Sequence, residues 1–481
     1  MRLYWVLILA SHDVKVHCCG LEEKGHCFAV EYGGEVLFID AGFNTSKNYY
    51  DFLDLAKDAK YADVSKVVGA PVLDNVPLKN VKGYCISHEH SDHVSGLPFI
   101  YNEVCTQTLS LVPIFSTRPT INGFEHQFRV YKIPYDKEVF ISVEDQDNVP
   151  KQYKVARTSS AFYSYFKVKI GKNFKVMWIP TEHSTQNAYH LAIELPEKRL
   201  IMYSGDFKLN LEENRPPLNV VRALREEYKK ILLICETIGV EEDGITGTER
   251  MMNEKLDQSL TGLDFRLMLV AIRASEVPRI HCFEEAAIKL KRRVALVGES
   301  MRDTYEAMRQ SFHGILIGDY VMFKPQELKQ IKPEDYCKYV FLVDARMWHT
   351  YDTSFHNILK GGAPLQAEEP GKKECKGEKY LDLGEKDLIV FSTTGPYEKY
   401  MEVCQKHMMR HVAACGAMLY PDLHVSGHGK IGDYRIFIEA LSPDVLIPFH
   451  REKAKRDLLA KKTHFKGEFH NLNDGDTYLW K

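Results

Sequence analysis

The densest set of protonatable side chains in the chain lies in ISHEHSDHVSGL, residues 86–97. There His88, His90, Asp92 and His93 follow a short apolar run, and imidazoles and carboxylates are ligands that Zn²⁺ prefers. Two histidines one residue apart on a loop can aim both rings at one ion, while Asp92 and His93 turn toward a second. An exposed polar loop is the alternative, but H-x-H-x-D-H is too dense for it. The segment therefore predicts a metal site.

A site for two ions needs more ligands, and later apolar runs supply them. His183 lies in PTEHSTQNAY, Asp206 follows RLIMYSG, and His450 ends DVLIPFH. A carboxylate directly after a strand and a glycine is suited to bridging two metals. Each residue alone is more often a structural hydrogen-bonding group. In this order they complete two coordination spheres.

Strands must position most of these residues. Two β-rich runs flank Gly33-Gly34, which is a hairpin signal, and VKGYC runs directly into the histidine cluster. After about residue 215 the pattern changes to strands that alternate with helices, which is typical of a parallel sheet. Polar residues at strand ends return in LHVSGHG and DVLIPFHRE. This order predicts one domain interrupted by another.

Composition limits the classes of partner. The 481 residues include 63 basic and 66 acidic side chains, so a nucleic acid would have to be held by a local groove or by metals. The 11 cysteines form no C-x-x-C pair, which predicts reduced thiols and a cytoplasmic protein. The run MRLYWVLILASH is too short to span a membrane. We expect it to form a first strand, with a weak signal peptide as the alternative, and we expect no membrane partner.

H-x-H-x-D-H, a later histidine, GDF and a last histidine resemble the metallo-β-lactamase family. SGDFKLN, CETIG, LHVSGHG and PFHRE also resemble its nucleic-acid-processing branch with an inserted β-CASP domain, most closely ribonuclease J. The resemblance runs from about Val14 to Leu479. It implies an α/β fold class, a metallo-β-lactamase αββα sandwich interrupted by an inserted α/β (β-CASP-like) domain. Residues 1–213 and 387–481 would form the sandwich, and residues 214–386 the insert.

The resemblance also implies a set of metal ligands. One ion would be held by His88, His90 and His183. The other would be held by Asp92, His93 and His450, and Asp206 would bridge both ions. Asp40 matches a family aspartate at a strand end that supports the ligand loop. Two Zn²⁺ per chain are expected, with Mn²⁺ as the alternative. Hydroxide activated by the two ions would attack a phosphodiester.

Further residues match the branch motifs that act on the substrate. With Asp92 and Asp206, the predicted catalytic residues are Glu236 in CETIG and His428 in LHVSGHG. His428 is the candidate general acid for the leaving 3′-oxygen, oriented by Glu236. A hydrogen bond that positions a phosphate is the alternative role for His428.

Three residues are predicted to bind the substrate. His424 and Ser426 lie in the same motif as His428 and are expected to contact neighbouring phosphates. Arg451 replaces the glycine of the family's usual HGE. It would add a phosphate contact, or alternatively crowd the path of the substrate.

The predicted function is metal-dependent hydrolysis of RNA, as an exonuclease or an endonuclease, with single-stranded RNA as the partner. A histidine at the position of His450 resembles the RNA-acting members of the branch and favours RNA as the substrate. DNA processing is the alternative. Hydrolysis of a small ester, thioester or lactam conflicts with the insert. A scaffold without metals conflicts with the seven filled ligand positions, and a flavin-linked member would need an appended domain. A homodimer is the assembly considered.

Overall fold

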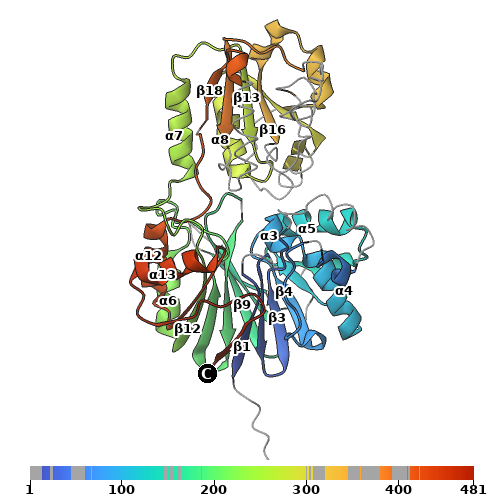
Figure 1. Cartoon of the computed structure of the whole chain (residues 1–481), viewed down its shortest axis with the longest axis vertical. Coiled ribbons are helices and arrows are strands. Elements are labelled where there is room, and N and C mark those ends of the chain that lie inside the picture. The colour runs from blue at the N-terminus through green and yellow to red at the C-terminus, as the bar shows by residue number, and fades with distance from the viewer. Residues whose placement is uncertain are drawn as a thin grey trace, which may run out of the picture. The chain divides into compact units, whose positions relative to one another are not determined.

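The computed structural model describes residues 13–481 apart from 22–24, 45–59, 67, 146–149, 151–152, 154, 160–163, 186, 300, 303–304, 307–319, 345–357, 359–379, 393–408, 410–411 and 422. The predicted first strand in MRLYWVLILASH lies outside these residues. The chain divides into two compact units (Figure 1). The first unit runs to Thr246, apart from three residues after His183, and resumes at Gly427; the second contains Gly247–Ser426.

The first unit contains a seven-stranded sheet in the order β21-β1-β2-β3-β4-β5-β6. β2 and β3 form an antiparallel hairpin at Gly33-Gly34, where both glycines have positive φ, as the sequence predicts. The strands are β1 (Val14–Gly20), β2 (Cys27–Tyr32), β3 (Glu35–Ile39), β4 (Val81–Cys85), β5 (Ile114–Ser116), β6 (Phe140–Ser142) and β21 (Thr477–Trp480).

A second sheet of eight strands completes the core of the first unit, in the order β20-β19-β12-β11-β10-β9-β8-β7. Side chains of both sheets, such as Phe28 and Leu37 from one and Trp178 and Leu191 from the other, share one buried apolar cluster. The strands are β7 (Val155–Ser159), β8 (Ser164–Ile170), β9 (Phe174–Pro180), β10 (Tyr189–Leu195), β11 (Arg199–Tyr203), β12 (Lys230–Glu236), β19 (Val445–Phe449) and β20 (Glu468–Phe469).

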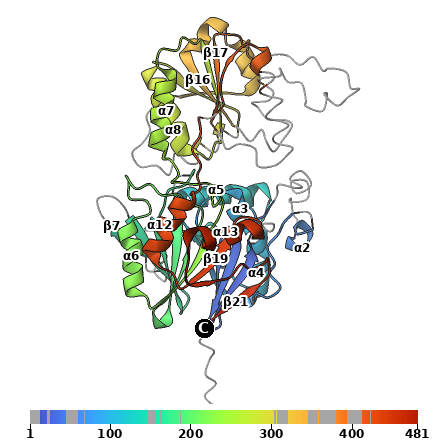
Figure 2. The same cartoon turned by 60° about the vertical axis from the view of Figure 1, so that its left-hand side comes forward.

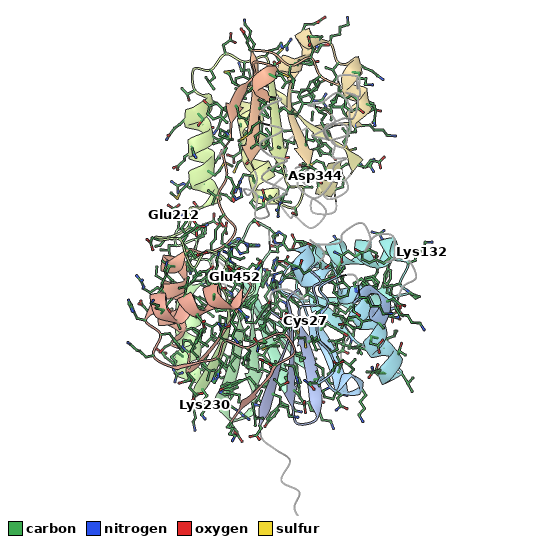
Figure 3. All side chains as sticks on the ribbon, in the orientation of Figure 1. Cys27, Lys132, Glu212, Lys230, Asp344 and Glu452 are labelled. Carbon is green, nitrogen blue, oxygen red and sulfur yellow. The ribbon has the colours of Figure 1, made fainter. Side chains whose placement is uncertain are left out.

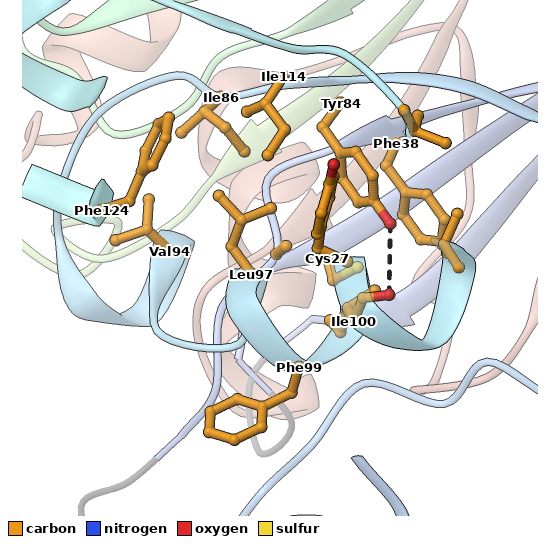
Figure 4. Packing of buried hydrophobic residues seen from close by; sticks show 14 of the residues in the cluster. Cys27, Phe38, Tyr84, Ile86, Val94, Leu97, Phe99, Ile100, Ile114 and Phe124 are labelled. Atoms are coloured by element: carbon orange, nitrogen blue, oxygen red, sulfur yellow. Dashed lines mark hydrogen bonds between the residues drawn. The ribbon is translucent and has the colours of Figure 1, made fainter. Parts of the chain in front are cut away.

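Helices cover the outer faces of this sandwich (Figures 1 and 2). On the first sheet, α4 packs Leu97 and Phe99 into an apolar cluster with Phe38 and Tyr84, and the Tyr84 hydroxyl donates to the Ile100 carbonyl (Figure 4). The two faces are covered by α4 (Leu97–Thr108) and α5 (Arg118–Val130), and by α6 (Leu218–Glu227), α12 (Ile431–Leu441) and α13 (Lys453–Thr463). The predicted αββα sandwich is confirmed.

Strands buried on both faces need no polar alternation. All seven residues of β10, YHLAIEL, are buried, because one face of the sheet packs on the other sheet and the opposite face on helices. The other helices among the described residues of the first unit are short: α2 (Tyr61–Val64), α3 (Ser91–Val94), η1 (Leu78–Asn80), η2 (Lys137–Val139) and η3 (Pro196–Lys198).

The second unit contains a six-stranded sheet in the order β15-β14-β16-β13-β17-β18, in which every pair is parallel. Parallel strands of one sheet need crossover connections, and α8 lies in the one that joins β13 to β14, with β16 between these two strands in the sheet. The elements are α7 (Glu249–Leu260), β13 (Leu267–Ile272), α8 (Val277–Lys289), β14 (Arg293–Val297), β15 (Tyr320–Phe323), η4 (Pro325–Gln330), η5 (Pro333–Lys338), β16 (Tyr339–Asp344), β17 (Asp387–Ser392) and β18 (Met418–Tyr420).

The units divide at residues other than the domain limits proposed from the sequence, 213/214 and 386/387. β12 pairs in parallel with β11 and β19, so residues 214–246 fall in the first unit. β17 pairs with β13, so residues 387–426 fall in the second. Sheet membership depends on pairing between distant segments, and a local change in pattern does not mark it.

The cysteines and the helices can each be compared with the predictions from sequence. Every cysteine that the structure describes is a free thiol. Within the described parts of the chain, no helix is both long enough and apolar enough to cross a membrane.

Candidate metal centre

The seven predicted ligands occur in two groups at strand ends of the first unit. In each group, one candidate ligand atom per residue lies within 4.8 Å of the others. The first group is His88, His90, His183 and Asp206; the second is His26, Asp92, His93 and His450. We call these eight residues the metal cluster.

Asp40, the residue that follows β3, holds the loop after β4 through hydrogen bonds. Its fully buried carboxylate accepts hydrogen bonds from the Ser87 N–H and hydroxyl, both at 2.8 Å, and from the Tyr203 hydroxyl at 2.7 Å. It also contacts His93 Nδ1 at 2.6 Å. Asp40 therefore fixes the ligand loop and the ring of His93, which is the supporting role expected for it.

The first group gathers around one oxygen of Asp206. Oδ2 lies 3.6 Å from His88 Nε2 and 3.7 Å from His183 Nε2, and His183 Nε2 lies 3.0 Å from His90 Nδ1. On the other side of its ring, His183 donates from Nδ1 to the Gly427 carbonyl at 2.6 Å. This outer bond leaves Nε2 as the nitrogen that faces the other members of the group.

The second group uses the same oxygen. Asp206 Oδ2 lies 3.3 Å from both His93 Nε2 and His450 Nε2. Asp92 Oδ2 lies 3.3 Å from His450 Nε2 and 3.4 Å from His26 Nε2. A single carboxylate oxygen thus contacts histidines of both groups, as a bridging ligand must.

His26 is a member that the sequence did not predict. It lies directly before β2, and a single histidine at that place carries no spacing signal. The ring is buried, and its centroid lies 4.0 Å from that of His450. Burial, followed by the neighbouring His450, lowers the pKa of His26 to about 3, so the imidazole is neutral.

Buried atoms of the cluster test whether cations fit. Among the described residues, Nε2 of His88, His93 and His450 and Oδ1 of Asp206 have no hydrogen-bond partner. Buried polar atoms normally have one. Imidazole nitrogens with carboxylate oxygens form a donor set for Zn²⁺, and also for Mn²⁺. The residues present therefore fit a centre for divalent cations.

The pKa shifts point to the same need for positive charge. Burial opposes ionisation of Asp206, but His450 and His93 hold its pKa well below its usual value. Burial opposes protonation of His450, yet Asp206 and Asp92 raise its pKa to about 10. Buried carboxylates that stabilise the positive charge of neighbouring imidazoles in this way will also attract a metal cation.

Glu236 and His428 lie beside the cluster. The buried carboxylate of Glu236, at the end of β12, accepts from the Phe207 and Ile238 N–H groups and the Tyr434 hydroxyl, at 3.0–3.1 Å. His428 Nδ1 lies 3.3 Å from both Glu236 oxygens and 3.9 Å from Asp206 Oδ2. The structure therefore brings the two predicted residues together.

The three predicted substrate-binding residues are not among the eight residues of the metal cluster. His424 and Ser426 fall in the second unit, where His424 Nδ1 accepts a hydrogen bond from Arg279 Nη1 at 2.9 Å. Arg451 lies in the first unit and pairs with Glu241 at 3.1 Å. The structure places none of these three in the metal cluster.

Comparison with known proteins gives several relatives that are named ribonuclease J. No protein-family model matches the chain. It is 24% identical over 449 residues to ribonuclease J of Pyrococcus abyssi, covering 90% of this chain and 88% of that protein. It is 22% identical to ribonuclease J of Mycoplasma pneumoniae and to ribonuclease J 1 of Streptococcus pyogenes, covering 90% of this chain and 67% of each relative.

A solved structure shares the fold. A protein of unknown function from Enterococcus faecalis V583 superimposes with a TM-score of 0.59 at 17% identity, covering 97% of this chain and all of that one. The chain is similar to the ribonucleases J over nine-tenths of its length, and it has the metallo-β-lactamase fold with a β-CASP-like insert that this similarity implies.

Proposed function

We propose that the protein is a ribonuclease that hydrolyses phosphodiester bonds of single-stranded RNA with two divalent cations per chain. The observation that carries this proposal is the position of Asp206 Oδ2, which lies 3.3–3.7 Å from histidine nitrogens of both ligand groups. Curated relatives named ribonuclease J support RNA as the substrate.

The ligand assignment follows the two groups. His88, His90 and His183 would hold one cation, Asp92, His93 and His450 the other, and Asp206 both. Zn²⁺ is the proposed metal because nitrogen donors predominate, and Mn²⁺ is the alternative. When bound, the two cations would supply Lewis acidity toward a phosphate and a nucleophile at neutral pH.

His428 is the proposed general acid. When water adds to phosphorus and the bond to the 3′-oxygen breaks, that oxygen needs a proton. Glu236 holds Nδ1 of His428, so transfer is assigned to Nε2. The His428 side chain is 19% exposed whereas that of Glu236 is fully buried, so the histidine can reach a substrate while the carboxylate only orients it.

The remaining assignments stay predictions from sequence. A phosphate contact by Arg451 would have to compete with its pair to Glu241. Roles for His424 and Ser426, a homodimer, a cytoplasmic location and the choice between exonuclease and endonuclease are likewise predictions.

The test is cleavage by purified protein of measured metal content. Single-stranded RNA and matched DNA, each with a 5′-monophosphate or a 5′-hydroxyl, are compared, with a His88→Ala variant and a His281→Ala control from α8. Metal-dependent RNA cleavage that is lost only in His88→Ala supports the proposal. Cleavage of DNA alone would favour the DNA-processing alternative. A protein that binds two cations and cleaves neither polymer contradicts the proposed function.

A further inference from the structure

His26 has the surroundings of a metal ligand and not those of an ordinary core histidine. Its Nδ1 is buried and has no hydrogen-bond partner among the described residues, and 3.4 Å from Nε2 to Asp92 Oδ2 is long for a hydrogen bond. His190, a buried histidine that donates from Nδ1 to the Ser204 carbonyl at 2.6 Å, belongs to no group of candidate metal ligands among the described residues. His26, by comparison, offers a ligand atom within 4.8 Å of ligand atoms of Asp92, His93 and His450, and Nε2 is the ring nitrogen that faces Asp92.

The backbone fixes this ring against the ligand loop. The His26 N–H donates to the Asp92 carbonyl at 2.8 Å, and the His26 carbonyl accepts from the Gly42 N–H at 3.0 Å. A Cβ added at Gly42 would lie 1.6 Å from the Asp92 carbonyl oxygen, so only glycine permits this approach. Cys27, the next residue, is labelled in the interior of the first unit in Figure 3. His26 is therefore held beside Asp92 by the main chain.

The distances match a coordination sphere. Ligand atoms bonded to one Zn²⁺ at about 2.0–2.2 Å lie about 3–4 Å apart. From Asp92 Oδ2 the distances are 3.3 Å to His450, 3.4 Å to His26 and 3.9 Å to His93. We propose that His26, through Nε2, is a fourth protein ligand of the second cation, beside Asp92, His93 and His450.

The consequence is an unequal pair of sites. The second site would have four ligands of its own besides Asp206, whereas the first has three histidines besides Asp206. The second cation should therefore bind more tightly and exchange more slowly. This inference rests on the metal centre of the proposed function.

Cobalt binding tests the proposal without measuring catalysis. Co²⁺ is titrated into the metal-free chain in competition with a chelating dye, and its visible spectrum is recorded. The variants are His26→Ala and the larger His26→Asn, with His17→Ala as a control histidine that bonds to Thr477 and Glu31. Circular dichroism establishes that each variant is folded.

The expected result concerns one of two sites. Wild type and His17→Ala bind two Co²⁺. Both His26 variants bind one Co²⁺ with unchanged affinity and the other about 100-fold or more weakly, and their visible bands lose intensity. Loss of a residue that only supports a ligand typically weakens metal binding by about 10–100-fold. Added imidazole should restore affinity and spectrum in His26→Ala.

Three results would overturn the proposal. Unchanged affinity and spectrum in both variants would show that His26 does not contact the metal. Weaker Co²⁺ binding with an unchanged spectrum and no rescue by imidazole would show that His26 only forms a hydrogen bond with Asp92 and is not a ligand. Wild type that binds no Co²⁺ would remove the proposed function as well, and is thereby distinguishable.

Discussion

The first and second units each bury a charged cluster, and the two clusters differ in how the charge is satisfied. In the second unit, the guanidinium of Arg279 donates to Glu249 at 2.7 Å, to the Val425 carbonyl at 2.9 Å and to His424 at 2.9 Å. We call the ion pair of Arg279 and Glu249 the arginine cluster. Burial opposes the charge on Arg279, but Glu249 more than compensates and raises its pKa. The guanidinium of Arg279 is therefore paired with a carboxylate, and each of its nitrogens donates a hydrogen bond.

The metal cluster differs in this respect. Nε2 of His88, His93 and His450 and Oδ1 of Asp206 are buried without hydrogen-bond partners among the described residues. The difference teaches that burial of charge alone does not identify a functional site. A cluster that satisfies its own donors and acceptors stabilises the fold, whereas one that leaves them turned toward a common point is built for an external ion.

The largest expected effect is at the bridging position. Asp206→Asn should lower RNA cleavage by about 10⁴-fold or more, as removal of one member of a catalytic unit does, and should reduce the bound metal to one cation or none. Elemental analysis and cleavage rates measure this. Glu249→Gln, in the arginine cluster, should keep both cations. Full metal content in Asp206→Asn would remove the distinction between the clusters.

Metal removal should affect only one cluster. If the cations are present at about 1,000 times their dissociation constant, they stabilise their surroundings by about 4 kcal/mol. Chelation should therefore accelerate hydrogen exchange in residues 86–94 and leave α8 unchanged. Equal acceleration in both segments would mean that the arginine cluster also depends on the metals.

Breaking the arginine cluster should cost stability without loss of metal. Arg279→Met leaves the carboxylate of Glu249 without its main partner and should destabilise the second unit by about 3 kcal/mol. A second substitution, Glu249→Met, should recover most of this loss because no charge is then left alone. Denaturant unfolding measures both effects, and a loss of bound cations in Arg279→Met would contradict this separation.

The smallest effect tests a buried histidine outside both clusters. Burial lowers the pKa of His190 to about 4, against 6.5 in an unfolded chain. Below pH 6.5 the unfolded chain takes up a proton that the folded protein refuses until about pH 4, so stability falls as pH falls. At pH 5 this amounts to about 2 kcal/mol. His190→Gln should be less sensitive by that amount between pH 7.5 and pH 5 in denaturant unfolding, and equal sensitivity would contradict it.

Patterns of neighbouring residues predicted the loop with four candidate ligands and one of the hairpins. H-x-H-x-D-H concentrates four candidate ligands on one loop after β4, and Gly33-Gly34 marks the β2–β3 hairpin, because both features are made by neighbouring residues. Family resemblance then selected His183, Asp206 and His450 from many polar residues at strand ends. Each of these alone has no local signal that separates a ligand from a hydrogen-bonding residue.

Long-range pairing was beyond the sequence pattern. β12 lies beside β19, more than 200 residues later, and this pairing decides which unit contains residues 214–246. No sequence pattern singled out Arg279, although it is the centre of a buried charge cluster. The same limit explains why His26 was missed.

The sequence by itself determined the kinds of ligand, the loop that carries four of them and the αββα class. Only the tertiary structure decided that Asp206 Oδ2 faces both groups and that His26 joins the second. The physical reason is that ligand chemistry is a property of residue type, whereas distances between atoms depend on strands paired across the whole chain.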